Sequence, residues 1–341
     1  MSTVYTTAQV LKKEELEALL PCMDRAKVAL IGDLCLDVYW DADMKKSELS
    51  RETPHYPLPV VSERYSPGGA ANAAANIKAL CPASLRVIGV IGRDWRGMML
   101  KQALAEHGIS TDHIIEDAHR VTNTYIKPMR HGISDVVYED PRIDFENFDS
   151  LSDETEQRLL NALDEAADAC DVICVSDQLK YGCITPRIRQ HLCELGKAGK
   201  TVLVDSRDRG GEYRCVTWKP NEVEASRTFR DGSELSLDAL AALCAQISQI
   251  NGRTALTTLG KHGCFVANGD RVTLCPACHV EPPIDFCGAG DTFLSGFAVM
   301  LAGGASAVDA ARVANLCSAV TIQKIGITGT ATREELLSTV H

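Results

Sequence analysis

Short runs rich in Val, Ile and Leu alternate along the chain with segments of helical periodicity, and this alternation constrains the fold most strongly. The candidate strands are residues 28–31, 86–91, 171–176, 201–204 and 255–259, each followed by Gly or Asp. Apolar runs of this length are typical of strands buried on both faces, as in a parallel sheet covered by helices. We therefore predict an α/β fold whose central, mostly parallel sheet is sandwiched by helices, with a ligand site at the carboxyl ends of the strands.

Apolar spacing also predicts several of the covering helices. They lie around residues 16–23, 70–80, 293–301 and 307–319, and Gly303 and Gly304 end the third. Residues 41–65 and 121–147 instead mix Pro, Thr, Tyr and charged residues in short alternating pieces, which predicts a small β-sheet lid. Neither repeats nor an interdomain linker are recognisable, so we expect residues 1–341 to form a single domain with this lid.

Charge excludes several classes of partner. Lys and Arg total 35 against 46 Asp and Glu, and the net charge of -11 repels nucleic acid and anionic membranes, so any phosphate must be bound locally. The apolar runs fall far short of the roughly 20 residues of a membrane span. Charged residues at 12–17 interrupt any signal-peptide stretch, which predicts a cytoplasmic protein.

The fourteen cysteines are scattered without regular spacing, as expected for reduced thiols that fill the core. One segment, Cys275-Pro276-Ala277-Cys278-His279, matches the pattern of c-type haem attachment. Such attachment requires export, and no export signal is recognisable, so we expect no haem. The nine histidines show no metal-ligand spacing, and we expect no structural zinc.

The segment Asp285-Phe286-Cys287-Gly288-Ala289-Gly290-Asp291-Thr292 stands directly before the 293–301 helix. Small residues at a helix start leave backbone amides uncovered, and these amides and the helix dipole can hold negative charge. Gly288, Ala289 and Gly290 are therefore predicted to form an anion hole, and Asp291 to act as general base towards a hydroxyl that approaches a bound phosphoryl group. A tight turn with an ordinary helix cap is the alternative for this segment taken alone.

Two upstream segments place polar groups at helix and strand ends. Gly68, Gly69 and Asn72 open the Ala-rich helix, and the Asn72 amide offers the donors and acceptors that a polyol ligand requires. Asp33 and Asp37 follow the first central strand, where carboxylates can accept sugar hydroxyls. A satisfied asparagine at a loop-to-helix junction and carboxylates that cap a turn are the alternatives.

Together these segments resemble the signatures of the ribokinase-like PfkB family of carbohydrate kinases, over nearly the whole chain. The segment ending in Asp291 resembles the family's phosphate signature, and Gly68, Gly69 and Asn72 resemble its N-terminal one. Asn221-Glu222-Val223-Glu224 is similar to the N-x-x-E element, and residues 258–263 are similar to the strand end of the nucleotide loop. Four motifs in this order make the resemblance specific. It implies a ribokinase-like fold.

The resemblance also implies roles for the matching residues. ATP is expected at Asn221, Thr258, Gly260, Lys261, Gly263 and Asn315. Glu224 is expected to organise Mg²⁺ and its water shell near the phosphates. The acceptor sugar is expected beneath the lid at Asp33, Asp37, Gly68, Gly69, Asn72, Arg142, Asp144 and Lys180. Lids of this family often pair between subunits, which implies a homodimer.

Within the family the likeness is closest to heptose 7-phosphate kinases, the kinase portion of bifunctional enzymes that make nucleotide-activated heptose. It runs through residues 25–33, 36–37, 39–40, 50–51, 57–61, 142, 144–146, 176–177, 180–182, 204–205 and 324–326. A phosphorylated sugar needs basic side chains in so acidic a chain, and the candidates are Arg51, Lys127, Arg130, Arg142 and Lys180. A solvated surface charge is the alternative for each. The chain stops at His341, without room for a nucleotidyltransferase half, so we expect a stand-alone kinase.

The predicted activity is transfer of the ATP γ-phosphate to a hydroxyl of a sugar phosphate similar to heptose 7-phosphate. Another sugar, sugar phosphate or nucleoside as acceptor is the first alternative, and a non-catalytic protein that senses a sugar or nucleotide is the second. A nicotinamide oxidoreductase is excluded because Gly32-Asp33-Leu34-Cys35 follows the first strand in place of a G-x-G-x-x-G turn.

Overall fold

Six parallel strands form the central sheet of the computed structural model, which describes residues 5–132 and 136–340. In spatial order they are β12 (Thr217–Trp218), β11 (Thr201–Ser206), β10 (Val172–Asp177), β2 (Lys27–Gly32), β5 (Ser84–Gly92) and β6 (Ile114–Asp117). The parallel strands predicted at 28–31, 86–91, 171–176 and 201–204 are confirmed. Their carboxyl ends share one edge of the sheet, where the site described below lies.

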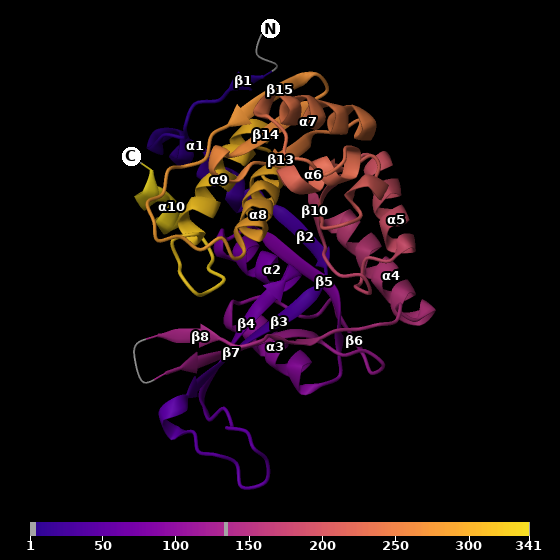
Figure 1. Ribbon diagram of the computed structural model, residues 1–341. Helices are drawn as coiled ribbons and strands as arrows, with labels where there is room; N and C mark the ends of the chain where they lie inside the picture. Colours follow the sequence, from indigo (N-terminus) through magenta and orange to yellow (C-terminus); the bar gives the residue numbers. More distant parts are fainter. Residues whose placement is uncertain (1–4, 133–135, 341) are drawn as a thin grey trace.

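Two apolar cores cover the two faces of this sheet, because successive side chains of a strand point to opposite faces. Val28 and Leu30 of β2 pack into one core, and Ala29 and Ile31 pack into the other. The first core is covered by α1 (Lys13–Arg25), α2 (Ala70–Ala79), α3 (Trp95–Glu106), α8 (Ala289–Ala302), α9 (Ala307–Thr321) and α10 (Arg333–Thr339). The second is covered by α4 (Asp153–Ala169), α5 (Pro186–Lys197), α6 (Glu222–Phe229) and α7 (Leu237–Asn251). Figure 1 shows α4 and α5 on one side of the strands and α2, α8 and α9 on the other.

The helices predicted from apolar spacing are confirmed as α1, α2, α8 and α9. Helix α8 is apolar around most of its surface because it packs against both α2 and α9 as well as the sheet. It ends at Gly303, and Gly304 follows with a φ of 88°. Within the described residues, no helix combines the length and the apolar character that crossing a membrane requires.

The strand predicted at 255–259 forms, but not as a central parallel strand. It is β13 (Ala255–Thr258), and it pairs antiparallel with β14 (Cys264–Asn268) in a second sheet completed by β15 (Arg271–Cys275) and β1 (Thr6–Thr7). The chain reverses through a single 3₁₀ turn, Gly260–His262, which leaves no length for a helical crossover. The Thr258 amide still donates to the Pro220 carbonyl, so β13 extends the central sheet beyond β12.

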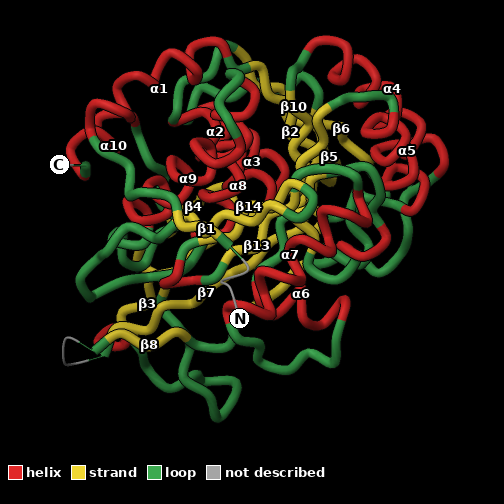
Figure 2. Tube along the Cα trace, turned by 90° about the horizontal axis from the view of Figure 1, so that it is seen from above, coloured by secondary structure: helices red, strands yellow, loops and turns green. Residues whose placement is uncertain are grey.

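The predicted lid segments belong to a third sheet, with strand order β4-β3-β7-β8 and β9 paired to β7. These strands are β3 (Leu34–Asp43), β4 (Val60–Gly69), β7 (Asn123–His131), β8 (Val137–Glu139) and β9 (Ile143–Phe145). The sheet begins earlier than residue 41, because Leu34, Leu36 and Val38 are buried in the first core and carry no surface alternation. Figure 2 shows β3, β7 and β8 at the end of the molecule opposite α4 and α5. Strand β4 ends at Gly69 and α2 begins at the next residue.

Candidate active site

A cleft of about 680 Å³ lies at the carboxyl ends of β10, β11, β12 and β13. It is lined by every residue predicted to bind the nucleotide, the metal or the transferred phosphate: Asn221, Glu224, Thr258, Gly260, Lys261, Gly263, Gly288, Ala289, Gly290, Asp291 and Asn315. The wall from α9 and the loop after β15 is apolar, with Val280, Ala319 and Ile322. The wall from β11 and β12 is charged, with Asp205 and Lys219.

The start of α8 presents free backbone amides to this cleft. Gly288 is the N-cap with a left-handed φ of 76°, and a Cβ there would lie 2.9 Å from the side-chain nitrogen of Asn72. Glycine therefore fits this position in both conformation and space. The Ala289 amide donates to the Phe286 carbonyl at 3.1 Å and closes the turn. Among the described residues, the donors left for an anion at this helix start are therefore the amides of Gly288, Gly290 and Asp291, whereas the Ala289 amide, also predicted to bind the anion, is engaged in the turn.

Asp291 is held by a chain of hydrogen bonds between α8 and α2. Asn72 Nδ2 donates to Asp291 Oδ2 at 2.9 Å, and Asn76 Nδ2 donates to Asn72 Oδ1 at 3.2 Å. Thr292 Oγ1 then donates to Asn76 Oδ1 at 3.0 Å, which returns the chain to α8. Asn72 therefore positions the carboxylate predicted to be the general base. The sequence did not predict this contact, since it joins residues 219 positions apart.

Burial raises the pKa of Asp291 to about 6. The hydrogen bond from Asn72 and the charge of Lys219 lower it, whereas the charges of Asp205 and Asp37 raise it further. The carboxylate is thus ionised at neutral pH and is still basic enough to accept a proton. Asp291 lines the cleft together with Asp205 and Lys219, and it is held by Asn72 of α2, the helix that follows strand β4.

Lys219 is a site residue that the sequence analysis missed. Its Nζ lies 2.9 Å from Asp205 Oδ2, and the lysine is only 3% exposed. Burial disfavours the ammonium, but the carboxylates of Asp205, Glu224 and Asp291 outweigh this effect and raise the pKa of Lys219. A charged lysine therefore lies at the base of the cleft. Lys219 stands two residues before the N-x-x-E element, and this proximity is the feature of the sequence that could have identified it as a site residue.

Asn221 and Glu224 form a reciprocal cap at the start of α6. Asn221 Oδ1 accepts the Glu224 amide at 2.8 Å, and Glu224 Oε2 accepts the Asn221 amide at 2.9 Å. Burial raises the pKa of Glu224, and the hydrogen bond from Asn221 opposes this shift. Glu224 keeps its other carboxylate oxygen, Oε1, outside the cap.

Asn315 secures the loop that forms the apolar wall. Its Nδ2 donates to the carbonyls of Cys275 and Pro276 at 3.0 and 3.1 Å. Cys275 is buried at the end of β15, whereas Cys278 and His279 line the cleft. The cysteine-rich segment singled out in the sequence is therefore part of this wall.

Several predicted acceptor residues gather at the base of the lid. Lys127 Nζ on β7 lies 3.3 Å from Asp37 Oδ2 on β3 and 3.1 Å from the Tyr39 hydroxyl. A Cβ on Gly68 would come 2.8 Å from Asp37 Oδ1, so glycine leaves room for this carboxylate. Burial raises the pKa of Asp37, while the charges of Lys127 and Arg142 lower it. Gly69, next to Gly68, ends β4.

Arg142 and Asp144 form an ion pair close to Lys127, Asp37 and Tyr39. The guanidinium makes two hydrogen bonds of 2.6 Å to the carboxylate and lies 4.4 Å from the centre of the Tyr125 ring. This bidentate geometry fixes the plane of the arginine. Asp37, Tyr125 and Asp144 stand opposite one another on the neighbouring strands β3, β7 and β9, so the predicted pair lies in the same region as the Lys127–Asp37 pair.

Asp33, predicted to bind the acceptor, is engaged instead with the backbone of a neighbouring loop. It is 2% exposed, and its carboxylate accepts the amides of Gln178, Leu179 and Cys183 at 2.7–2.8 Å. Burial raises the pKa of Asp33 to about 6 against the opposing effect of these amides. The residue therefore holds the loop after β10, and this function depends on contacts about 145 positions away in the sequence.

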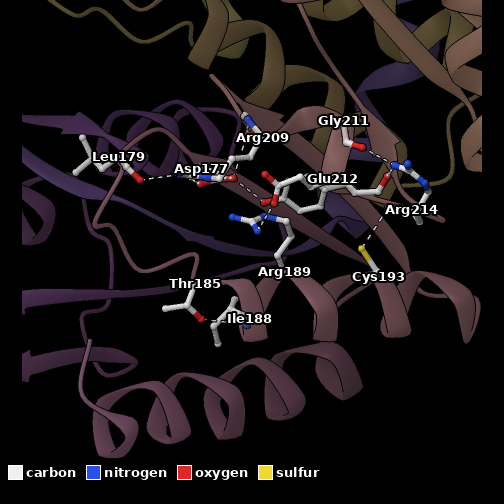
Figure 3. A network of polar contacts seen from close by, with 12 residues as sticks. Asp177, Leu179, Thr185, Ile188, Arg189, Cys193, Arg209, Gly211, Glu212 and Arg214 are labelled. Carbon is white, nitrogen blue, oxygen red and sulfur yellow. Dashed lines mark hydrogen bonds and ion pairs between the residues drawn. The ribbon is translucent and has the colours of Figure 1, made fainter. Parts of the chain in front are cut away.

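A second buried carboxylate supports the same loop (Figure 3). Asp177 accepts hydrogen bonds from Arg209, from Ser206 at 2.8 Å and from Tyr213 at 2.9 Å. Arg209 also donates to the Leu179 carbonyl at 2.6 Å. Lys180, predicted to bind the acceptor, is exposed on this loop with its Nζ 5.1 Å from the centre of the Tyr181 ring.

The fold recurs in solved kinases of low sequence identity. Arabidopsis thaliana ribokinase, complexed with ribose and ATP, superposes with a TM-score of 0.70 at 20% identity, over 92% of this chain and 98% of that chain. Escherichia coli phosphofructokinase-2, in complex with substrates and products, gives 0.69 at 18% identity, over 92% and 98%. The fold class is therefore ribokinase-like, as predicted.

A family model described as "pfkB family carbohydrate kinase" matches residues 25–333. The chain belongs to this family and is a carbohydrate kinase. Curated relatives include the bifunctional protein HldE of Geotalea uraniireducens, 31% identical over 97% of this chain, and that of Azorhizobium caulinodans, 34% identical over 91%. The chain spans 66% and 64% of the lengths of these two relatives.

Proposed function

We propose that the protein transfers the γ-phosphoryl group of ATP to a hydroxyl of a sugar phosphate. The observation that carries this proposal is the position of Asp291. Its carboxylate is held by Asn72 beside the free amides of α8, in the same cleft as Lys219 and Glu224. A carboxylate in this position can take the proton of an acceptor hydroxyl while the amides stabilise the transferred phosphoryl group.

The proposed step is a single displacement at phosphorus. The acceptor oxygen forms a bond to the γ-phosphorus, the bond from that phosphorus to the oxygen bridging to the β-phosphate breaks, and ADP leaves. The hydroxyl proton passes to the Asp291 carboxylate. Lys219 lies at the charged base of the cleft, where a phosphate oxygen would find a cation.

ATP is the proposed donor because the cleft offers surfaces for both of its parts. The apolar wall with Val280, Ala319 and Ile322 suits a flat base, and the amides of α8 suit its phosphates. The similar fold of the ribokinase complexed with ribose and ATP supports this donor.

Mg²⁺ fits the chemistry of the charged wall. It is commonly bound through one or two carboxylates together with substrate phosphates and water. Glu224 Oε1 does not take part in the helix cap and is available to a metal ion or its water shell. Asp205 lines the same cleft. Among the residues described, no three His, Cys, Asp or Glu side chains gather as a metal cluster, so phosphates and water would supply the other ligands. When bound, Mg²⁺ neutralises charge on the phosphates.

The proposed acceptor is a sugar phosphate similar to heptose 7-phosphate, phosphorylated at position 1. Two observations support it: the HldE relatives are 31–34% identical over most of the chain, and cations accompany the lid carboxylates. Arg142 and Lys127 are held in place there, by Asp144 and by Asp37 and Tyr39. A fixed guanidinium is suited to a phosphate group already present on the acceptor.

An acceptor screen tests this proposal. Initial rates of ADP release are measured with Mg-ATP and heptose 7-phosphate, unphosphorylated heptose, fructose 6-phosphate, ribose or a nucleoside. We expect the highest kcat/KM for heptose 7-phosphate, about tenfold or more above unphosphorylated heptose, because one charge-assisted contact contributes that much. The variant Arg142→Gln should narrow this difference. If a nucleoside or a free sugar were the best acceptor, the proposed acceptor class would be wrong. If none of these compounds stimulated ADP release, the result would favour a non-catalytic sensing protein.

We also propose that two copies pair through their lids. Apolar side chains stand exposed on the lid sheet and its flanking segments: Leu58, Val60, Val61, Val137, Tyr138 and Ile143. Strand β4 lies at the edge of that sheet, where its backbone can pair with another strand. Such pairing would shield both the edge and the apolar residues from water.

Light scattering measures this pairing directly. The full chain of 36.9 kDa should elute with about twice that mass. Val61→Asp should shift the equilibrium towards single copies, because it places a charge in the proposed interface. Ile250→Asp is the matched control, since Ile250 is exposed on α7, which packs against the second sheet through β13, β14 and β15. A mass of one chain for the unaltered protein would contradict the proposal.

We place the reaction in the cytosol. All fourteen cysteines are free thiols, as is usual where glutathione and thioredoxin keep proteins reduced. ATP is also available there as a phosphoryl donor.

A further inference from the structure

Arg207 is a charged residue of the cleft that neither the sequence motifs nor the mechanism above uses. It follows β11 directly, its amide donates to the Asp177 carbonyl at 3.2 Å, and it lines the cleft. The neighbouring arginines are committed to carboxylates, Arg209 to Asp177 and Arg227 to Asp208. In the part of the chain that the structure describes, the guanidinium of Arg207 has no such partner.

The order of the strands gives the position of Arg207 along the cleft. From β13 the neighbours are β12, β11, β10 and β2, and adjacent strands lie about 4.8 Å apart. The nucleotide-loop residues follow β13, the N-x-x-E element follows β12, and Asp37 lies on β3, which continues from β2. Arg207 therefore stands between the nucleotide side and the acceptor side, where a transferred phosphoryl group must pass.

The charges that line the cleft also favour a contact between Arg207 and a phosphate group. Four carboxylates line it, those of Asp205, Glu222, Glu224 and Asp291. Lys219 is paired with Asp205, and Lys261 lies at the far side, on the turn after β13. A triphosphate brought next to these carboxylates needs further positive charge near its terminal group. Arg207 is the lining arginine on that side.

We propose that Arg207 binds the terminal phosphoryl group of the nucleoside triphosphate. This inference rests on the proposed function and deepens it by naming a phosphate contact outside the family motifs. The planar guanidinium can donate two parallel hydrogen bonds to phosphate oxygens, which a lysine cannot do. Removal of this contact should weaken binding of ATP more than binding of ADP, because ADP lacks the terminal group.

Nucleotide titrations of the full chain test this proposal. Dissociation constants for ATP and for ADP are measured by calorimetry at fixed Mg²⁺ for the unaltered protein, Arg207→Gln, Arg207→Lys and Arg227→Gln. For Arg207→Gln we expect a rise of about tenfold in the ATP constant, in line with the loss of one charge-assisted contact, and little change for ADP. The ATP dissociation constant of Arg207→Lys should lie between those of the unaltered protein and of Arg207→Gln. Arg227→Gln, which alters an exposed arginine of α6 that does not line the cleft, should leave both constants unchanged.

Each other outcome has a defined meaning. Equal weakening of ATP and ADP, or no change in either, would overturn the role of Arg207 at the terminal group. Normal ATP binding combined with a loss of rate only for phosphorylated acceptors would overturn it in favour of a contact to the acceptor. If the unaltered protein bound neither nucleotide, the proposed function itself would fail, which the first titration separates from a failure of the inference. Unchanged thermal melting of the variants excludes unfolding as the cause, as expected for an exposed side chain.

Discussion

Asp291→Asn should lower kcat by about 10²- to 10⁴-fold and leave the dissociation constant for ATP nearly unchanged. Asparagine keeps the size of the side chain, and its carbonyl oxygen can still accept the hydrogen bond from Asn72. It cannot take a proton from the acceptor hydroxyl. The loss should therefore appear in the chemical step, as measured by single-turnover phosphorylation of the acceptor and by calorimetric titration of ATP.

The pH profile gives an independent readout of the same residue. Because burial raises the pKa of Asp291 to about 6, the carboxylate becomes protonated as the pH falls through this value, and the rate of the unaltered enzyme should fall with it. The residual rate of Asp291→Asn should not show this step. An equal rate in the variant, or a fall below pH 6 that persists in it, would contradict the assignment of Asp291 as the base.

Stability measurements separate this effect from unfolding. The pKa of Asp291 is raised above the ordinary value of 3.8, so the fold loses stability as the pH rises from about 4 to about 6 and the carboxyl ionises. At pH 7 this cost is fully present, and the uncharged asparagine avoids it. The Tm of Asp291→Asn at pH 7 should therefore be no lower than that of the unaltered protein.

Gly182→Ala should destabilise the protein and displace the loop after β10. A Cβ at residue 182 would lie 2.0 Å from Asp33 Oδ1, well inside contact distance. The carboxylate cannot turn away, because the amides of Gln178, Leu179 and Cys183 hold it on both oxygens. Forcing extra volume into such a place typically costs about 1–3 kcal/mol, so the free energy of unfolding should fall by that amount or more in urea titrations.

Hydrogen exchange identifies the loop as the source of this loss. The amides of Gln178, Leu179 and Cys183 should lose protection in Gly182→Ala, because their acceptor can no longer keep its position. Gly132→Ala is the matched control, since among the residues that the structure describes a Cβ there would meet only the Val136 carbonyl, at 3.8 Å. Full stability and protection in Gly182→Ala would show that Asp33 does not hold the loop as described.

Local patterns in the sequence predicted much of the fold and the segments that line the cleft. The β2, β5, β10 and β11 strands and the α8 start are encoded in short segments, so periodicity and the Gly288-Ala289-Gly290-Asp291 run were sufficient to find them. Strand β13 was predicted as a strand, but its pairing was not, since orientation depends on the turn that follows it.

The part that was missed depends on contacts between distant segments. Asp33 looked like a sugar ligand because its sequence neighbours do not reveal the three amides that reach it from residues 178–183. In the same way, the sequence neighbours of Asn72 do not indicate that its side chain contacts Asp291. Lys219 escaped notice because a lysine is most often a surface charge, and only its packing against Asp205 shows that it is buried.

The direct passage of β4 into α2 connects the lid sheet to Asn72 and, through it, to Asp291. Gly69, with a φ of 53°, is both the last residue of the lid strand and the cap of the helix that carries Asn72. No linker separates β4 from α2, so a tilt of the lid sheet must either change the backbone conformation at Gly69 or move α2 with it. In the second case the hydrogen bond from Asn72 to Asp291 would lengthen or shorten with the tilt, so the lid strand and the Asp291 carboxylate are coupled through one backbone junction.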